Sequence, residues 1–165
     1  MRTIPDPGFA DDQGAVPPEV AEALAGYAAD PDGRHAATLA VLQHARLLVP
    51  VMAVLGEVEY DDAGLAHDKT SDMATVLMRG RDGRLALLAF TGTTSLRAWN
   101  PEARPVPVSV RQAAEAALHD QAEALVIDVA GPVVFVVQGD ELRALAEGYT
   151  LAEVAGTQAW VRPGG

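Results

Sequence analysis

Apolar side chains recur at helical spacing near the start of the chain. Val20, Leu24 and Tyr27 fall at i, i+4 and i+7, which places them on one face of a helix. We expect this helix to open at Pro17-Pro18, because proline is tolerated in a first turn. The preceding residues, 1–16, hold proline, glycine and aspartate with almost no apolar periodicity, a pattern that predicts a flexible arm.

A second helix is expected over residues 34–46, with Leu39 and Leu42 on its inward side. The residues Asp30-Pro31-Asp32-Gly33 separate it from the first helix, because their composition is typical of a turn. Together the two patterns predict an N-terminal helical hairpin over residues 17–46.

From residue 47 onward the apolar residues gather in short continuous runs instead. The run 47–55 has the length of a buried strand, in which Pro50 favours an edge position or a bulge. Asp82-Gly83 favours a hairpin turn, because this dipeptide readily takes positive φ values. Four further strands are expected over 73–78, 85–91, 124–129 and 133–137.

The remaining elements are predicted by capping and breaking signals. Ser109 and Gln112 have the spacing of a capping box, which predicts a helix from residue 110. A second helix is expected between Asp140, as its cap, and Gly148. The pattern Thr150-Leu151-Ala152-Glu153 repeats the capping box and predicts a last short turn. Two shorter segments are a helical turn over 96–99 and an extended segment over 104–108.

This order of elements predicts an α+β fold. Two hairpins joined by a helix give a mixed, largely antiparallel sheet of about five strands with helices packed on it, preceded by the N-terminal helical hairpin. A chain of 165 residues suits one domain, which we expect over 17–165, with the hairpin at 17–46 and the core at 47–148.

The composition narrows the classes of partner. The chain has 23 acidic and 12 basic side chains, a net charge of −11. An acidic surface repels phosphate backbones and anionic lipids, so we expect neither nucleic-acid nor membrane binding. No apolar run approaches the roughly 18 residues of a membrane span, and residues 1–8 have no signal-peptide pattern, so the expected location is the cytoplasm. The lack of cysteine excludes zinc fingers, iron–sulfur clusters and cysteine nucleophiles.

Six segments in a particular order and spacing resemble the SseB family of bacterial proteins. They are 46–51 (RLLVPV), 69–74 (KTSDMA), 87–92 (LLAFTG), 95–99 (SLRAW), 103–108 (ARPVPV) and Asp128 with Gly131-Pro132. The resemblance runs from Arg46 to about Gly148, and residues 1–33 lie outside it. The family's name refers to enhanced serine sensitivity, and the resemblance implies no catalytic residues. The type III secretion label that some members carry is set aside, because this chain has no long heptads.

The most suggestive polar segment is Thr91-Gly92-Thr93-Thr94-Ser95, which follows an expected strand and opens a short helix. Free amides at a helix start, with hydroxyls beside them, can bind an anion. Lys69 and Arg104 would add positive charge if the fold brings them close. However, the loop lacks the spacing of a Walker A or dinucleotide motif. Ordinary capping by Thr94 or Ser95 explains the hydroxyls equally well.

Trp99 allows two interpretations. It either seals a sheet edge or, with Pro101, Arg104 and Pro105, forms an exposed aromatic–proline–arginine patch, a composition favoured at binding hot spots.

The sequence contains no established catalytic pattern. There is no G-x-S-x-G motif, and the four histidines lack metal-ligand spacing. We therefore expect no catalytic residue, no metal and no cofactor. The expected function is that of a non-enzymatic protein-binding or regulatory module, which binds a protein partner or self-associates through the 91–104 loop with Lys69 nearby. The alternative is a small-molecule or anion-binding protein that uses Thr91–Ser95 with Lys69 and Arg104. The reference to serine in the family name suggests an amino acid as one such ligand.

Overall fold

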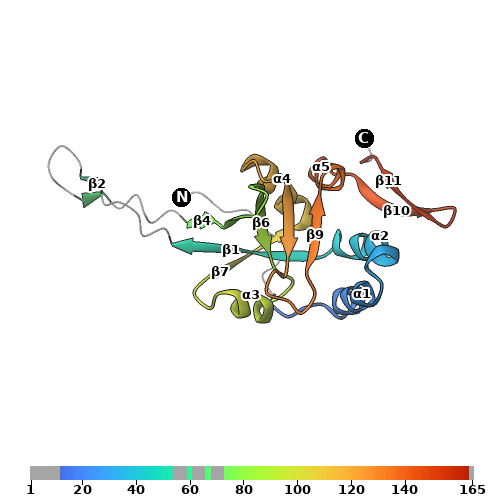
Figure 1. Ribbon diagram of the computed structural model, residues 1–165, viewed down its shortest axis with the longest axis horizontal. Coiled ribbons are helices and arrows are strands. Elements are labelled where there is room, and N and C mark those ends of the chain that lie inside the picture. The colour runs from blue at the N-terminus through green and yellow to red at the C-terminus, as the bar shows by residue number, and fades with distance from the viewer. Residues whose placement is uncertain (1–11, 54–58, 61–65, 68–72, 164–165) are drawn as a thin grey trace.

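The N-terminal helical hairpin and the α+β class are confirmed by the computed structural model (Figure 1), which describes residues 12–53, 59–60, 66–67 and 73–163. The hairpin consists of α1 (Pro18–Ala29) and α2 (Pro31–Leu42). The second helix begins three residues earlier than expected. The carboxylate of Asp30 caps it by accepting a hydrogen bond from the Gly33 amide at 3.1 Å. The expected turn is therefore the first turn of α2.

The long strand β1 (Arg46–Ala53) lies in the middle of a three-stranded antiparallel sheet, between β4 (Met73–Thr75) and β7 (Arg104–Ser109). The expectation that Pro50 marks an edge strand is wrong. Pro50 lies directly opposite Pro105. In an antiparallel ladder alternate pairs exchange no hydrogen bonds. Two prolines at such a pair therefore remove none of the hydrogen bonds between β1 and β7.

A four-stranded sheet stands beside the first, in the order β5 (Leu77–Arg79), β6 (Leu85–Ala89), β8 (Ala124–Ile127) and β9 (Phe135–Gln138). The β6–β8 pair is parallel and the other two pairs are antiparallel. The expected strand 73–78 is divided between the two sheets. A backbone bridge joins the sheets, since Leu48 and Phe90 exchange hydrogen bonds of 2.7 and 2.8 Å.

The single sheet of about five strands is thus replaced by several smaller ones. Two-stranded pairs add β2 (Glu59–Tyr60) with β3 (Ala66–His67), and β10 (Thr150–Val154) with β11 (Thr157–Val161). The antiparallel character is confirmed in both pairs.

Three more helices pack on these sheets, α3 (Thr93–Trp99), α4 (Val110–His119) and α5 (Asp140–Ala146). The capping box of α4 is confirmed. The Ser109 hydroxyl accepts from the Gln112 amide at 3.0 Å, and the Ser109 amide donates to the Gln112 side chain at 2.9 Å. The cap of α5 is Gly139 rather than Asp140, which is the first helical residue.

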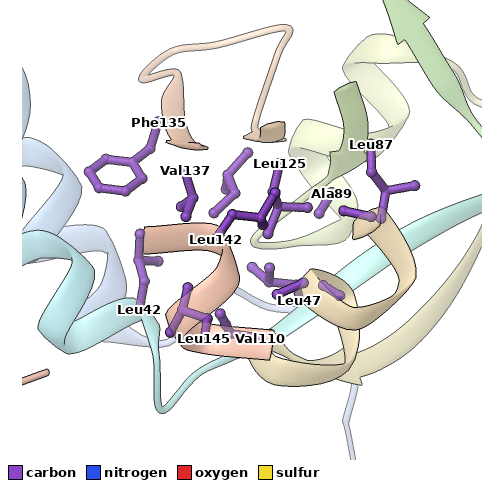
Figure 2. Close-up of a cluster of buried hydrophobic side chains, with 14 of the residues drawn as sticks. Leu42, Leu47, Leu87, Ala89, Val110, Leu125, Phe135, Val137, Leu142 and Leu145 are labelled. Atoms are coloured by element: carbon purple, nitrogen blue, oxygen red, sulfur yellow. The ribbon is translucent and has the colours of Figure 1, made fainter. Parts of the chain in front are cut away.

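The main core lies where α2, α4 and α5 meet one face of the sheets (Figure 2). Its labelled members are Leu42, Leu47, Leu87, Ala89, Val110, Leu125, Phe135, Val137, Leu142 and Leu145. A second cluster, which includes Leu48, Leu88, Phe90, Leu96 and Val126, fills the opposite face under α3. Because β6 and β8 are buried on both faces, their sequences are continuous apolar runs rather than alternating ones.

The C-terminal hairpin is the largest departure from the sequence-based expectation. Residues 150–153 were expected to open a helical turn, but they form β10. Ala155 and Gly156 have φ values of 51° and 80°, the positive values that a two-residue hairpin turn requires. The Gln43 side chain anchors the hairpin by accepting from the Leu151 amide at 2.7 Å and donating to its carbonyl at 2.6 Å. The capping-box prediction failed because this long-range pairing outweighs a local signal.

Candidate functional site

The hydroxyls of the expected ligand loop converge on a buried carboxylate, that of Asp128. Asp128 accepts hydrogen bonds from the Thr91 amide at 2.8 Å, the Thr91 hydroxyl at 2.6 Å and the Ser95 hydroxyl at 2.8 Å. All three side chains are buried, and Asp128 is 3% exposed. The carboxylate is therefore satisfied by three donors within the loop that it faces.

The backbone after β8 holds Asp128 in this position. Its φ of 57° lies in the left-handed region, which aspartate tolerates better than most residues. The Asp128 amide donates to the Ala89 carbonyl at 2.9 Å, and its carbonyl accepts from the Gly131 amide at 2.9 Å. The parallel pairing of β6 and β8 thus places Asp128 beside the residues that follow β6.

Arg46 approaches the same loop from the first residue of β1. Its guanidinium donates to the Thr91 carbonyl at 2.6 Å and to the Ala15 carbonyl at 2.8 Å. It also holds the Asp12 carboxylate through Nε and through a second nitrogen, the latter at 3.0 Å. The hydrogen bond from Arg46 lowers the pKa of Asp12 below its ordinary value. Arg46 itself is only 9% exposed, and the Asp12 carboxylate neutralises its charge.

Residues 12–16 form a strap across the start of α3. The Gly14 carbonyl accepts from the Thr93 amide at 2.8 Å and from the Thr93 hydroxyl at 3.2 Å. Gly92 lies beneath the strap, where an added Cβ would stand 2.7 Å from Val16 Cγ2. The expectation of a flexible arm is wrong for residues 12–16, because Arg46 and Thr93 bind them; residues 1–11 lie outside the described part.

The polar loop is therefore occupied by the protein's own groups. Thr91 and Ser95 are buried and do not reach the surface, which corrects their place in the expected binding surface. Thr93 is half-buried against the strap, and Thr94 is exposed. The cap of α3 is Gly92, without a side-chain cap, so capping by Thr94 or Ser95 is also wrong. The Ser95 hydroxyl, one of the two that the capping interpretation assigned to the helix start, donates to Asp128 instead.

The two other expected residues lie at the far end of α3 and beyond it. Trp99 is half-buried and packs on Phe90, with ring centroids 5.6 Å apart and planes inclined by 35°. Trp99 therefore packs against the second cluster while part of its surface stays accessible, and the hot-spot interpretation remains a prediction. Arg104 is exposed at the start of β7, with Pro101 and Pro105 exposed beside it. Lys69 lies outside the residues that the structure describes.

Sequence reasoning missed three members of this network, Asp12, Arg46 and Asp128. Arg46 and Asp128 each begin or end a segment that carries the family resemblance, and a charged residue bordering a buried strand is a signal for a buried partner. Asp12 gave no such signal, because it belongs to a glycine-rich and aspartate-rich stretch.

Two hollows in the described surface lie away from this network. One of about 590 Å³ runs along α1 and α2 and is lined by Ala23, Gly26, Ala37, Thr38 and their neighbours. Another of about 500 Å³ lies beside β9 around Arg84, Gln121 and Gln138. Within 12–53, 59–60, 66–67 and 73–163, no three His, Asp or Glu side chains gather as metal ligands. In the same residues no helix has the length and apolar character to cross a bilayer.

Comparison with known proteins identifies the domain. The profile of the SseB protein N-terminal domain matches residues 20–144. Curated proteins and solved structures gave no significant match. The matched region begins within α1, so the expectation that residues 1–33 lie outside the family is wrong for residues 20–33. It ends within α5, before the β10–β11 hairpin. Because the match covers most of the chain and includes the Arg46, Thr91–Ser95 and Asp128 segments, this protein belongs to the SseB N-terminal domain family.

Proposed function

We propose that this domain is a non-enzymatic protein-binding or regulatory module, and that its binding surface is the 97–104 surface, defined by Arg97, Trp99, Pro101 and Arg104. One observation supports this choice over a small-molecule site. The Thr91 and Ser95 hydroxyls are bound by Asp128, and the Thr93 amide and hydroxyl are bound by the strap, whereas Arg97, Pro101 and Arg104 near the other end of α3 are exposed. A loop whose donors are already engaged has few left to hold an anion.

The 97–104 surface is held in shape before any partner arrives. Trp99 rests on Phe90, which fixes one side of the indole ring. The Asn100 amide donates to the Leu96 carbonyl at 2.9 Å, and the Asn100 side chain accepts from the Glu102 amide at 2.9 Å. A surface that is ordered in the free protein loses less conformational entropy on binding. Its aromatic and arginine content is also that of binding hot spots.

The charge of the surface favours a particular chemistry in the partner. Arg97 and Arg104, before and after Trp99 in the sequence, are exposed in a chain whose net charge is −11, and Glu102 between them is the one exposed acidic residue of this segment. Val106 follows on β7 and is 42% exposed. Local positive charge around an apolar centre is complementary to a segment that carries acidic and apolar side chains. We therefore propose a protein partner of that kind.

The test compares two charge-reversed variants that leave the core intact. Arg97→Glu with Arg104→Glu alters the proposed surface. Arg111→Glu with Arg143→Glu makes the same charge change on α4 and α5, where both side chains are more than half exposed. Proteins captured from the source lysate by wild type and both variants are quantified, and any partner lost only with the first variant is purified for titration. We expect its affinity to fall by about tenfold or more.

Equal capture by both variants, with both still folded, would exclude the 97–104 surface. A thermal-shift screen with amino acids, nucleotides and phosphate examines the alternative function. A dose-dependent rise in Tm that Arg104→Ala abolishes would replace the protein-binding proposal with a small-molecule site.

A further inference from the structure

The two edges of the β10–β11 hairpin differ in how they are covered. The outer edge of β10 is capped at Leu151, whose amide and carbonyl are both bonded to the Gln43 side chain. The backbone amide and carbonyl of Leu151 therefore point away from β11. In an antiparallel pair the opposite residue has the same arrangement, so the amide and carbonyl of Trp160 point away from β10, toward the free edge of β11. Because this direction alternates from residue to residue along a strand, the amide and carbonyl of Gln158 also point outward. Within the described residues, β11 pairs with no strand other than β10.

The outer edge of β11 lacks the features that protect other edges of this protein. Its residues, Thr157–Val161, include no charge and no proline. On the edge strand β7, Pro105 and Pro107 occupy the outward-facing positions, where they remove the free donors. The edge strand β5 has only three residues and ends in Arg79. Charged residues, proline and short length are the usual means of preventing strand addition, so β11 is open to it.

We propose that β11 pairs in antiparallel fashion with β11 of a second copy of this chain. The two-fold axis passes beside Ala159, and the product is a four-stranded sheet in the order β10, β11, β11, β10. In this register Ala159 lies opposite Ala159 of the second copy, and Gln158 lies opposite Trp160. Gln158 and Trp160 carry the amides and carbonyls that point to the free edge. The two-fold axis makes two Gln158–Trp160 pairs between the copies, and in each pair both residues donate and accept a backbone hydrogen bond.

The sequence of β11 suits this register in two ways. The backbone groups of Ala159 form hydrogen bonds with β10. The two Ala159 residues of the paired copies are therefore a non-hydrogen-bonded pair, the closely spaced kind with about 4.5 Å between Cα atoms. A methyl side chain fits that spacing. Thr157 lies opposite Val161, which places a β-branched pair at each end and no like charges in contact.

Charge is the argument for a second copy as the occupant. The chain carries a net charge of −11, so two copies repel each other over much of their surface. One face of the hairpin carries no charge at all. Its members are Thr150, Ala152, Val154, Thr157, Ala159 and Val161. Val154 is 53% exposed and Val161 is 45% exposed. Pairing through β11 brings two uncharged faces into one sheet and doubles the width of this neutral face.

The hairpin lies at the right-hand end of the molecule in Figure 1, apart from α3, which lies near the lower middle. The self-pairing edge is therefore separate from the 97–104 surface, and each proposal is tested without the other. The hairpin also lies beyond the matched family region, which ends at residue 144.

A single introduced thiol reports the register directly, because the chain contains no cysteine. In the paired sheet the Cα separation at Ala159 falls within the range of about 4.4–6.8 Å that a disulfide requires. We expect Ala159→Cys to form a covalent dimer under mild oxidation, as seen on a non-reducing gel. The matched control is Ala152→Cys, on the same face of the hairpin but on β10. In the proposed dimer the two introduced thiols of this control lie three strand spacings apart, about 14 Å. Equal cross-linking of both variants, or of neither, would overturn the proposal.

A second variant tests the backbone pairing. Gln158→Pro removes an outward amide that the β10 ladder does not use, so the hairpin is retained. We expect sedimentation velocity to give a dimer for the wild type and a dissociation constant raised about tenfold or more for the variant, because two intermolecular hydrogen bonds are lost. A wild type that sediments as a monomer up to high concentration contradicts the inference, as does a dimer that Gln158→Pro leaves unchanged while circular dichroism shows both chains folded.

Discussion

Arg46 holds Asp12 with two nitrogen atoms of its guanidinium, and so fastens the N-terminal strap to the first residue of β1. The same guanidinium donates to the Thr91 carbonyl. One buried cation therefore connects the strap, the central strand and the loop before α3. A buried cation of this kind depends on its anionic partner, since an unpaired charge in the interior is costly.

The first prediction concerns the pH dependence of this ion pair. The pKa of Asp12 is lowered in the folded protein, chiefly by the hydrogen bond from Arg46. The pair therefore stabilises the fold above the ordinary carboxyl pKa of 3.8, and this contribution is lost as the pH falls through the lower folded-state pKa. We expect Asp12→Asn to lower the free energy of unfolding by about 1–2 kcal/mol at pH 7. Urea unfolding of both proteins should show the difference shrinking below pH 4, and a constant difference down to pH 3 would contradict the assignment.

The second prediction concerns the close approach of the strap to Gly92. An added Cβ would stand 2.7 Å from Val16 Cγ2 and 3.0 Å from the Gly14 carbonyl oxygen. We expect Gly92→Ala to displace residues 14–16, to lower the Tm and to speed proteolytic cleavage of the strap. The control is Gly26→Ala in the interior of α1, where the Cβ meets nothing within 4 Å. That change should stabilise the protein by about 0.5–1 kcal/mol. Equal protease resistance of wild type and Gly92→Ala would count against the packing described.

The third prediction concerns the carboxylate at the centre of the network. Asp128→Ala removes the acceptor of three buried hydrogen bonds and puts alanine at a φ of 57°. We expect a loss of about 2–4 kcal/mol in the free energy of unfolding by urea. Asp128→Asn should cost less, because asparagine tolerates the same φ and keeps one acceptor oxygen. If both variants lost the same stability, the hydrogen bonds would not be the cause.

The fourth prediction concerns the anchor of the C-terminal hairpin. Gln43→Met preserves the length of the side chain but removes both hydrogen bonds to Leu151. We expect amide hydrogen exchange to accelerate in β10 and β11 while β6 and β8 keep their protection, since two-stranded hairpins are marginally stable alone. Gln138→Met, at an exposed position of β9, serves as the control. Unchanged exchange at Leu151 in Gln43→Met would show that the amide does not anchor the hairpin.

Local signals predicted much of the fold. The periodicity of Val20 and Leu24, the capping box of Ser109 and the Asp82-Gly83 turn each act within a few residues, and each is confirmed. Predictions failed where a distant residue decides the outcome. Thr150–Glu153 has the spacing of a capping box, but pairing with β11 and the contact with Gln43 make it a strand. Pro50 lies in a central strand because Pro105 stands opposite it.

The same division holds for the candidate site. The sequence alone singled out Thr91–Ser95, Trp99 and Arg104, and it indicated the family, because these are properties of short segments in a particular order. Only the tertiary structure decided how those residues are used. Asp128 reaches Thr91 and Ser95 across 37 and 33 positions of the chain, and Arg46 reaches Thr91 across 45. Hydrogen bonds over such separations depend on which strands pair. The pairing of β6 with β8 and of β1 with Phe90 therefore buried the loop and left Trp99 and Arg104 at the surface.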